Sequence, residues 1–447
     1  MILLAYYGDD FTGSTDVLEA LTASGVATVL FTEPPSQEML ARFPHVRALG
    51  IAGNSRAMSP DEMEQALPVA FASLVEHRPA IVHYKVCSTF DSSPRVGSIG
   101  RAIDIGHRVF QNRFVPLVVG APSLQRFCVF GNLFARSGLD SPAYRLDRHP
   151  TMRHHPVTPM TEADLRVHLA HQTNRPIELF DVLMLDRDPA AWEATPADGD
   201  VVLFDTLTSE HLATIGRLIW EAQAREQKPL FVAGSSGIEY ALTSHWQTTN
   251  LVSQNKRDAA SPQPVDRALV MSGSCSPVTD RQIAWALAHG FAEVPLDTTR
   301  LLQSSQHEAA LAEIAELVVA QFDAGRSVIV HTSRGPDDDR IAATQQFVPP
   351  GLTSRSLGGI LGRILGEVLR SRTVARVAIT GGDTSGYVAR EIGIDALEMA
   401  GPLAPGAPLC VAHSRRPEID GVEFTFKGGQ VGHDDFFGSL LRGGPNR

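Results

Sequence analysis

Two adjacent aspartates, Asp9 and Asp10, follow the first apolar run of the chain and precede a Thr-Gly-Ser turn in the stretch GDDFTGSTD. The apolar run predicts a buried strand, and STDVLEALTASG predicts a helix that Thr12 or Ser14 caps and Gly25 ends. A helix N-terminus carries partial positive charge and free N–H groups, so it can receive a carboxylate or a phosphate. The two carboxylates could therefore accept hydrogen bonds from ligand hydroxyls or hold a metal. The structural alternative is that they only cap the helix and form the turn.

Polar side chains that suit a small acid follow two further apolar runs. Residues 84–100, YKVCSTFDSSPRVGSIG, crowd donors and acceptors such as Ser88, Asp91 and Arg95 into one loop ahead of a predicted helix. Arg56, in GNSRAM, could make a two-pronged contact with a carboxylate, although a lone arginine is more often simply exposed. The density of polar groups in the loop favours binding of a polyhydroxylated acid over a merely structural role.

Three glycine-rich turns in the second half of the chain suit phosphate binding. They follow apolar runs in MSGSCSPVTDRQI (271–283), AITGGDTSGYVA (378–389) and FKGGQVGHDDFF (426–437). Small residues let backbone N–H groups approach a phosphate closely. No GxxxxGK[ST] motif occurs, so the chain lacks a Walker A loop. One such turn is weak evidence, but three in the same half of the chain favour nucleotide binding.

Short apolar runs alternate with helical patterns along the chain. This predicts an α/β fold with two domains, each with a largely parallel sheet flanked by helices. The predicted strands include VRALGIAG, AIVHYKV, DVLML, RALVMSG, RVAITGG and EFTFKGG. The alternation lapses at LVSQNKRDAASPQPVD, so we expect one domain over residues 1–250, a linker over 251–266 and a second domain over 267–447. The polar clusters directly follow the apolar runs, where open α/β sheets bind ligands.

Length and composition narrow the function classes. The 447 residues are 43% apolar and 20% charged, as in ordinary globular proteins, and the net charge of −11 argues against nucleic acid or an anionic membrane as the main partner. No apolar run approaches the ~20 residues that span a bilayer, and the first residues lack the basic segment of a signal peptide. The four cysteines show no zinc-site spacing, which favours reduced thiols and a cytoplasmic location.

Six stretches, in combination and in this order, resemble the four-carbon acid sugar kinase family over nearly the whole chain: GDDFTGSTD, KVCSTFDSSP, RHHPVTPM, SGSCSPVTDRQI, GGDTSGYVA and KGGQVG. The resemblance implies an enzyme that uses ATP to phosphorylate the terminal primary hydroxyl of tetronates or 3-oxo-tetronates. It implies a sugar-acid site in the N-terminal domain, a nucleotide site in the C-terminal domain and an active site in the cleft between them. On the substrate side it assigns Asp9, Asp10, Arg56, Ser88, Asp91 and Arg95. On the nucleotide side it assigns Ser274, Ser276, Gly381, Gly382, Asp383, Thr384 and Gly429.

Phosphoryl transfer needs in-line positioning and charge neutralisation, so the expected cofactors are ATP and Mg²⁺, and the sequence leaves the metal ligands open. One aspartate would accept the hydroxyl proton. Asp10 or Asp9 is the first choice, and Asp383, at a glycine-rich turn, is the rival. The segment APSLQRFCVFGNLF departs from the family pattern on the substrate side, so a branched relative such as 3-oxo-isoapionate is a further candidate substrate.

The sequence leaves two other functions open. The chain could be a non-catalytic sugar-acid sensor on the same scaffold. It could also be a phosphatase of the haloacid dehalogenase type, but that chemistry needs the motif Asp-x-Asp-x-Thr, whereas the aspartates here are adjacent. The expected partners are a small sugar acid and ATP, with no nucleic acid and no membrane, and the sequence leaves open whether the chain forms a homodimer.

Overall fold

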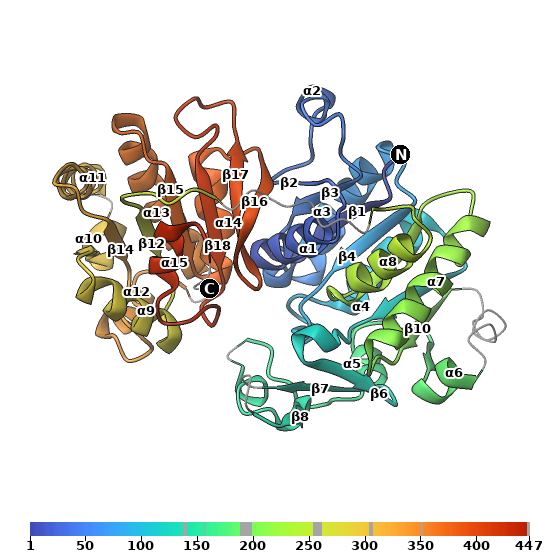
Figure 1. Cartoon of the computed structure of the whole chain (residues 1–447). Helices are drawn as coiled ribbons and strands as arrows, with labels where there is room; N and C mark the ends of the chain where they lie inside the picture. The colour runs from blue at the N-terminus through green and yellow to red at the C-terminus, as the bar shows by residue number, and fades with distance from the viewer. Residues whose placement is uncertain are drawn as a thin grey trace. The chain divides into compact units, whose positions relative to one another are not determined.

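The computed structural model describes residues 1–136, 141–155, 157–187, 199–253, 262–303, 307–349 and 352–444. By its internal contacts the chain divides into two units (Figure 1). Unit 1 comprises Met1–Asp9, Ala20–Thr28 and Pro34–Arg257. Unit 2 comprises Asp10–Glu19, Val29–Glu33 and Asp258–Arg447. Each unit has its own sheet and its own buried core.

A parallel sheet forms the centre of unit 1. Its strands lie in the order β3 (Ala48–Ala52), β1 (Leu4–Gly8), β4 (Ile81–Lys85), β11 (Leu230–Gly234), β5 (Phe114–Val118), β10 (Asp200–Phe204) and β9 (Ile177–Phe180). The central strands are short, wholly buried runs, as expected for parallel strands that helices cover on both faces. The register aligns Gly8 with Ala52 and with Lys85, so the residues that follow these three strands meet at one edge of the sheet.

Helices and a small antiparallel sheet complete unit 1. The helices are α2 (Gln37–Ala41), α3 (Pro60–Glu76), α4 (Ile99–Phe110), α5 (Leu165–Ala170), α6 (Val182–Arg187), α7 (Ser209–Arg225) and α8 (Gly237–Thr248). The small sheet has the order β6 (Arg126–Val129), β7 (Asn132–Arg136) and β8 (Ala143–Arg145). Short 3₁₀ turns are η1 (Ser55–Ala57), η2 (Pro122–Leu124), η3 (Leu146–Arg148) and η4 (Met152–His154). The rings of Phe71, Phe110 and Phe231 pack together where α3 and α4 meet the sheet, with centroids 5.1–5.8 Å apart.

Unit 2 combines a parallel sheet with an antiparallel edge. Its strands lie in the order β13 (Ala292–Pro295), β14 (Val328–His331), β12 (Leu269–Ser272), β15 (Arg376–Thr380), β18 (Glu423–Lys427), β17 (Ala407–His413), β16 (Ala396–Ala404) and β2 (Thr28–Phe31). The strands from β13 to β18 run parallel, and β17, β16 and β2 continue the sheet by antiparallel pairing. Register aligns Ser272 with Thr380 and Thr380 with Lys427, which brings the three predicted glycine-rich turns to one edge.

The helices of unit 2 include two that begin at these turns. They are α9 (Pro277–Ala288), α10 (Thr298–Leu302), α11 (His307–Asp323), α12 (Asp339–Gln345), α13 (Thr353–Ser371), α14 (Gly382–Ile392) and α15 (Phe436–Arg442). The hydrophobic core on one side of the sheet includes Val270, Ile283, Ile329 and Phe437. Helices α9 and α14 start where β12 and β15 end, so their N-termini face the turn region.

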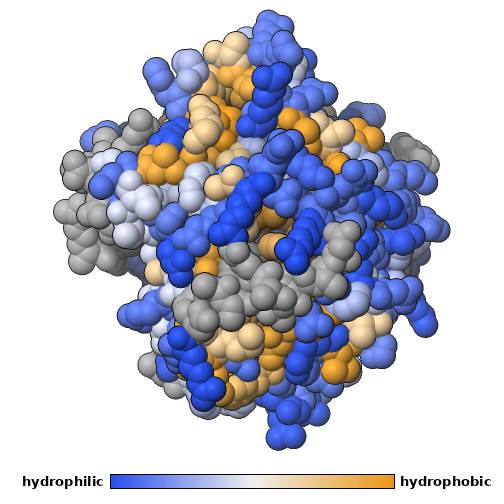
Figure 2. Space-filling view, turned by 90° about the vertical axis from the view of Figure 1, so that its right-hand side faces the viewer, coloured by the Kyte–Doolittle hydropathy of each residue, from blue (hydrophilic) through white to orange (hydrophobic). Residues whose placement is uncertain are grey.

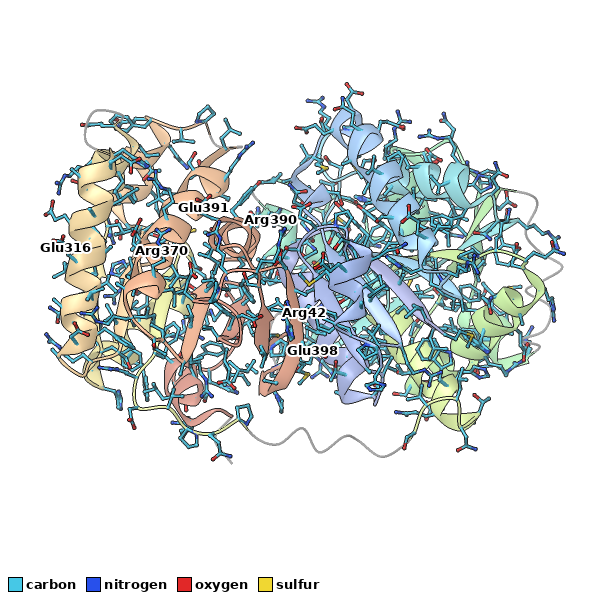
Figure 3. The ribbon with its side chains drawn as sticks, turned by 90° about the horizontal axis from the view of Figure 1, so that it is seen from above. Arg42, Glu316, Arg370, Arg390, Glu391 and Glu398 are labelled. Atoms are coloured by element: carbon cyan, nitrogen blue, oxygen red, sulfur yellow. The ribbon has the colours of Figure 1, made fainter. Side chains whose placement is uncertain are left out.

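Two N-terminal segments pack with the second half of the chain inside unit 2. The first half of α1 (Phe11–Ala23) is one of them: the ring centroid of Phe11 lies 4.7 Å from that of Phe426. The end of β2 is the other, since Arg390 of α14, labelled in Figure 3, donates to the Thr32 carbonyl and forms an ion pair with Glu33 at 3.1 Å. Asp10 therefore belongs to the same compact unit as the glycine-rich turns.

Two local predictions were wrong. The run DVLML forms helix α6 rather than a strand: Asp181 accepts a hydrogen bond from the Met184 N–H at 2.9 Å, and the leucines and methionine favour a helix once it is capped. Helix α1 is capped neither by Thr12 nor by Ser14, because it begins earlier, at Phe11. The two-domain α/β prediction is confirmed. The boundaries 1–250, 251–266 and 267–447 stay a prediction, and residues 254–261 of the expected linker lie outside the described residues.

No helix within the described ranges is long and apolar enough to cross a membrane. The face drawn in Figure 2 is mainly hydrophilic, and its apolar residues form small, separate areas among polar ones.

Candidate functional site

The first cluster of predicted site residues is an ion pair at the carboxyl edge of the unit 1 sheet. Asp9 follows β1 directly, and its backbone N–H donates to the Lys85 carbonyl at 2.9 Å. The Arg56 guanidinium donates to both carboxylate oxygens of Asp9, from Nε at 3.1 Å and from Nη2 at 2.8 Å. The Asp9 side chain is buried and that of Arg56 is 22% exposed. Two opposite charges joined by two bonds hold each other in a fixed orientation.

Backbone contacts fix the position of this ion pair. The Arg56 N–H donates to the Asp9 carbonyl at 2.9 Å, and the Gly53 N–H donates to the Gly8 carbonyl at 2.9 Å. Gly53 cannot carry a side chain, because an added Cβ would lie 2.4 Å from the Gly8 carbonyl oxygen. The sequence GNSRAM therefore folds tightly against the end of β1, and this close approach delivers Arg56 to Asp9.

The loop after β4 brings a second carboxylate into the same region. Thr89 Oγ1 donates to Asp91 at 2.8 Å and lies 2.9 Å from Cys87 Sγ. Burial raises the pKa of the Cys87 thiol to about 11, with a further rise from Asp91 and an opposing effect of Arg56. Burial lowers the pKa of Arg126, and Cys87 and Asp91 oppose that shift. Asp91, Cys87, Arg56 and Arg126 thus interact with one another at this edge of the sheet.

Ser88 and Arg95, the other two predicted substrate-side residues, are placed differently. Ser88 is half-buried in the same loop. Arg95 is exposed, and within the described residues its side chain forms no hydrogen bond or ion pair, although its backbone N–H donates to Ser93 Oγ at 3.3 Å. The structure therefore groups Asp9, Arg56 and Asp91 but does not tie Arg95 to them.

The nucleotide-side residues converge in unit 2. A Cβ added at Gly429 would lie 2.9 Å from both Ser274 Oγ and Ser276 Cβ. Gly381 has a φ of +121°, which glycine tolerates, and an added Cβ would lie 3.4 Å from the Ser274 nitrogen. Thr384 touches the first turn in the same way, because a Cβ at Gly273 would lie 2.7 Å from Thr384 Oγ1. The glycines are thus required by the close approach of three backbone turns.

Ser276 also caps α9, with its hydroxyl accepting from the Val278 N–H at 3.1 Å. The N-termini of α9 and α14 both open onto this region, and helix N-termini attract anions. Gly382 is the first residue of α14, and Asp383 follows it as an exposed side chain in the first turn. The arrangement of turns and helix ends suits a polyphosphate.

Asp10 lies beside this region. Its carboxylate accepts from the Gly13 N–H at 2.8 Å and from Thr12 Oγ1 at 2.9 Å, which is the bonding of a helix N-cap. A Cβ added at Gly382 would lie 3.7 Å from that same Thr12 Oγ1. The capping alternative for Asp10 is therefore realised, and the cap stands next to the N-terminus of α14. Capping and chemistry are compatible, because a carboxylate offers about four lone-pair sites.

Lys427 and Thr279 are partners of the glycine turns that the sequence reasoning did not assign to the site. Lys427 Nζ donates to Thr279 Oγ1 at 3.2 Å, and Thr279 Oγ1 donates to the Gly429 carbonyl at 3.0 Å. A lysine directly before Gly-Gly was visible in KGGQVG, but its burial was not. Thr279 lies within the predicted helix and gave no signal.

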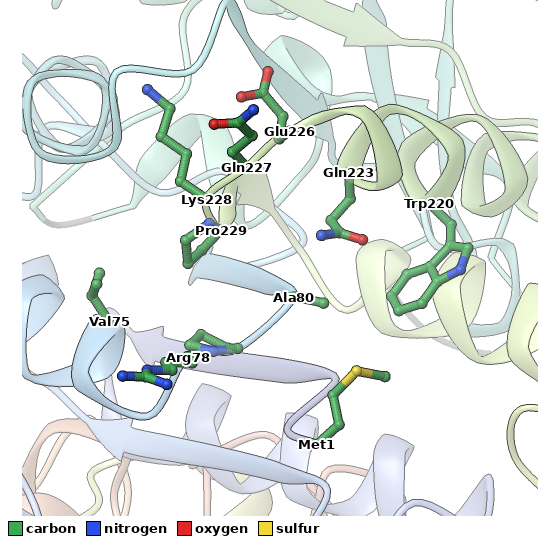
Figure 4. Close-up of a pocket in the computed structure, with 11 residues that line it drawn as sticks. Met1, Val75, Arg78, Ala80, Trp220, Gln223, Glu226, Gln227, Lys228 and Pro229 are labelled. Atoms are coloured by element: carbon green, nitrogen blue, oxygen red, sulfur yellow. The ribbon is translucent and has the colours of Figure 1, made fainter.

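The described residues contain no group of three or more His, Cys, Asp or Glu side chains that could hold a metal ion by themselves. A cavity of about 500 Å³ in unit 1 lies elsewhere, at the amino ends of β4 and β11, and its lining includes Met1, Arg78, Trp220 and Lys228 (Figure 4). It opens at the edge of the sheet opposite to Asp9 and Arg56, so it is not part of the candidate site.

Comparison with known proteins matches the two parts of the chain to two different family models. A family model described as a sugar-binding N-terminal domain matches residues 4–242, and one described as a nucleotide-binding C-terminal domain matches residues 269–437. The 3-oxo-isoapionate kinase of Paraburkholderia graminis is 48% identical, over 99% of this chain and 94% of that protein. The 3-oxo-tetronate kinase of Pectobacterium atrosepticum is 28% identical, over 98% of each chain.

Solved structures share the fold. A crystal structure from Salmonella typhimurium LT2 is 25% identical and covers 100% of both chains with a TM-score of 0.78. A Haemophilus influenzae protein is 24% identical and covers 98% of both chains with a TM-score of 0.71. With both domain models matched in order and a relative that is 48% identical over 99% of this chain, the chain belongs to the four-carbon acid sugar kinase family.

Proposed function

We propose that this protein transfers the γ-phosphoryl group of ATP to the terminal primary hydroxyl of a small sugar acid. The observation that carries the proposal is the convergence in unit 2 of the turns at Ser274, Gly381 and Gly429, beside the helix N-terminus that Asp10 caps. This geometry provides backbone donors for phosphates together with a carboxylate. The kinase relatives and the matched nucleotide-binding domain support the same function.

ATP would be held by the glycine-rich turns. The backbone N–H groups of Ser274 and Gly382 are the ones suited to phosphate oxygens, because the Gly381 N–H donates to the Lys427 carbonyl at 3.0 Å and the Ser276 N–H donates to Ser274 Oγ at 3.2 Å. Thr384 packs against Gly273, in the turn that follows β12. Ser276 and Gly429 keep the turns in register through direct contact.

The sugar acid would be held in unit 1. Arg56, fixed by Asp9, offers positive charge for the carboxylate of the substrate, and Asp9 and Asp91 offer acceptors for its hydroxyls. Ser88 and Arg95 stay candidates for binding the same ligand, because solvent can reach both side chains: Ser88 is half-buried and Arg95 is exposed. Arg126 adds a second guanidinium near Cys87 and Asp91.

Asp10 is the preferred general base. Asp9 is the weaker choice because the Arg56 guanidinium holds both of its carboxylate oxygens. Asp10 accepts from one N–H and one hydroxyl and stands beside the phosphate turns. Asp383 stays the rival, since it is exposed in the first turn of α14.

Mg²⁺ is the expected second cofactor, and the residues present fit it. This ion is commonly bound by one or two carboxylates together with substrate phosphates, so a site without three converging protein ligands is sufficient. Asp383 is the carboxylate on the phosphate side that would hold it together with phosphate oxygens, which leaves Asp10 for the proton. When bound, the ion would neutralise phosphate charge.

A coupled assay for ADP release tests the proposal. The panel contains 3-oxo-isoapionate, 3-oxo-tetronate and D- and L-tetronates, each with ATP and Mg²⁺. We expect substrate-dependent ADP release, with 3-oxo-isoapionate preferred because of the 48% identity to the kinase with that name. Binding of a sugar acid without any ADP release would instead indicate a sensor. Release of phosphate from a phosphorylated sugar acid, without nucleotide, would indicate a phosphatase.

A further inference from the structure

Lys427 is a buried lysine beneath the proposed phosphate turns. It ends β18, and its carbonyl accepts from the Gly381 N–H at 3.0 Å, so its backbone joins two of the glycine turns. Its side chain has no exposed surface. Nζ donates to Thr279 Oγ1 at 3.2 Å and to the Gly428 carbonyl at 3.1 Å, and it lies 5.6 Å from the centroid of the Phe436 ring.

These partners of Lys427 are all neutral. Within the described residues, no carboxylate forms an ion pair with its ammonium group. The charged side chains of the surrounding elements are paired with one another: Asp280 with Arg334, Asp434 with Arg281, Asp435 with Arg442 and Glu423 with Arg376. Helix α14 also packs against β18, and it carries Asp383, exposed in its first turn, and Arg390, which pairs with Glu33. His433 is a further titratable group in the adjoining loop, and its carbonyl accepts from Gln282.

A buried ammonium without a counter-charge is unfavourable, because it has lost its hydration and gained no anion. Burial accordingly lowers the pKa of Lys427 to about 7. A polyphosphate at the turns above would supply the missing negative charge. The electrostatic attraction would act through a thin, partly dry layer consisting of Thr279 and the Gly428–Gly429 backbone.

We propose that Lys427 is a positioning residue for the nucleotide, which holds the glycine turn through Thr279 and supplies from beneath it the positive charge that the bound phosphates require. This inference rests on the proposed function, since it takes the three turns as the phosphate site. It follows that nucleotide binding draws a proton from solvent onto Nζ when the lysine is neutral beforehand. In the complex, its pKa rises above that of the free protein.

The sign of the pH dependence follows from this linkage. A group that binds its proton more tightly in the complex favours binding at low pH, and the advantage is lost as pH rises from its free to its bound pKa. Nucleotide affinity should therefore fall above pH 7, by as much as about tenfold per pH unit. A merely structural lysine would not produce this slope.

The test is calorimetry of ADP binding to the full chain at pH 8 in two buffers with different ionisation enthalpies. We expect wild-type protein to take up a large fraction of one proton. Lys427→Met should abolish the uptake and weaken ADP binding by about tenfold at pH 7. Lys228→Met, which removes an exposed lysine, should change neither quantity.

Two results would overturn the inference: ADP binding by the wild type with no proton uptake at pH 8, or unchanged uptake in Lys427→Met. If the Lys427→Met variant does not fold, the proton uptake of the wild type still tests the inference by itself. Failure of the proposed function looks different, because ADP would then not bind to the wild type under any of these conditions.

Discussion

Asp9 and Arg56, 47 positions apart in sequence, form a two-bond ion pair at the end of the first strand of unit 1. The sequence suggested that each binds the substrate separately, whereas the structure shows them bound to each other. The two contacts use Nε and Nη2 of Arg56 and both carboxylate oxygens of Asp9, so Asp9 fixes the orientation of the arginine. Arg56 and Asp9 therefore function as one element, and their variants should be interpreted together.

Arg56→Lys should raise the KM for the sugar acid at least tenfold and leave the KM for ATP nearly unchanged. A lysine ammonium is a point charge and cannot keep both bonds to Asp9 while contacting a carboxylate. Steady-state kinetics with each substrate varied in turn checks this. Asp9→Asn should give a similar pattern, because it releases the arginine. An equal loss for both substrates would show that the pair supports the fold rather than the sugar acid.

Asp10→Asn should lower kcat by a factor on the order of 10²–10⁴, the usual contribution of a positioned acid–base group. Asparagine is also a good N-cap, so the bonds to the Gly13 N–H and Thr12 should largely survive and the variant should keep its thermal stability. Asp383→Asn is the matched control for the rival base. A normal kcat in Asp10→Asn together with a large loss in Asp383→Asn would assign the base to Asp383.

Cys275 should react with a thiol reagent at pH 7.5 well before Cys87. Cys275 is exposed between Ser274 and Ser276, whereas burial and Asp91 raise the pKa of Cys87 to about 11, so Cys87 has almost no thiolate at that pH. Peptide mass spectrometry after brief labelling measures both sites. ADP should protect Cys275, since the proposed phosphate turn contains it. Labelling of Cys275 at an unchanged rate with saturating ADP would contradict the assignment of this turn.

The thermal stability of the protein should fall between pH 6.5 and pH 4 in part through His168. Its Nε2 lies 2.9 Å from Ser92 Oγ and accepts from Gln172 Nε2 at 3.0 Å, which requires the neutral ring. Burial lowers the pKa of His168 to about 4, below its unfolded value of 6.5, a difference on the order of 3 kcal/mol. The unfolded chain therefore takes up the proton first as pH falls, and the folded state loses its advantage.

Differential scanning calorimetry at pH 7 and pH 5 compares wild type with His168→Gln, which keeps a polar side chain but cannot titrate. The wild type should lose more Tm between the two pH values than the variant. Equal losses would mean that other groups account for the acid sensitivity.

The sequence by itself determined the class of fold and the local chemistry. Strands and helices depend largely on residues that are close together in the sequence, and the alternation of apolar runs with helical patterns records them. The two-unit α/β fold and the glycine-rich turns after β12, β15 and β18 were therefore predictable. Local signals also misled: DVLML looks like a strand, and only the cap at Asp181 and the surrounding packing make it a helix. The correct predictions and the wrong one have the same cause: the periodicity of apolar residues reports on neighbouring residues in the sequence and not on tertiary packing.

Only the tertiary structure decided which residues act together. The bond between Asp9 and Arg56 depends on the register of β1 with β3, and the grouping of Asp10 with Gly382 depends on α1 packing against α14. The burial of Lys427 beneath Thr279 and Gly429 is equally invisible in KGGQVG, because it depends on contact with α9, whose Thr279 lies 148 positions away in the chain. The burial of a side chain, and with it the pKa of its ionisable group, depends on contacts between segments that are distant in sequence. A sequence motif does not show these contacts.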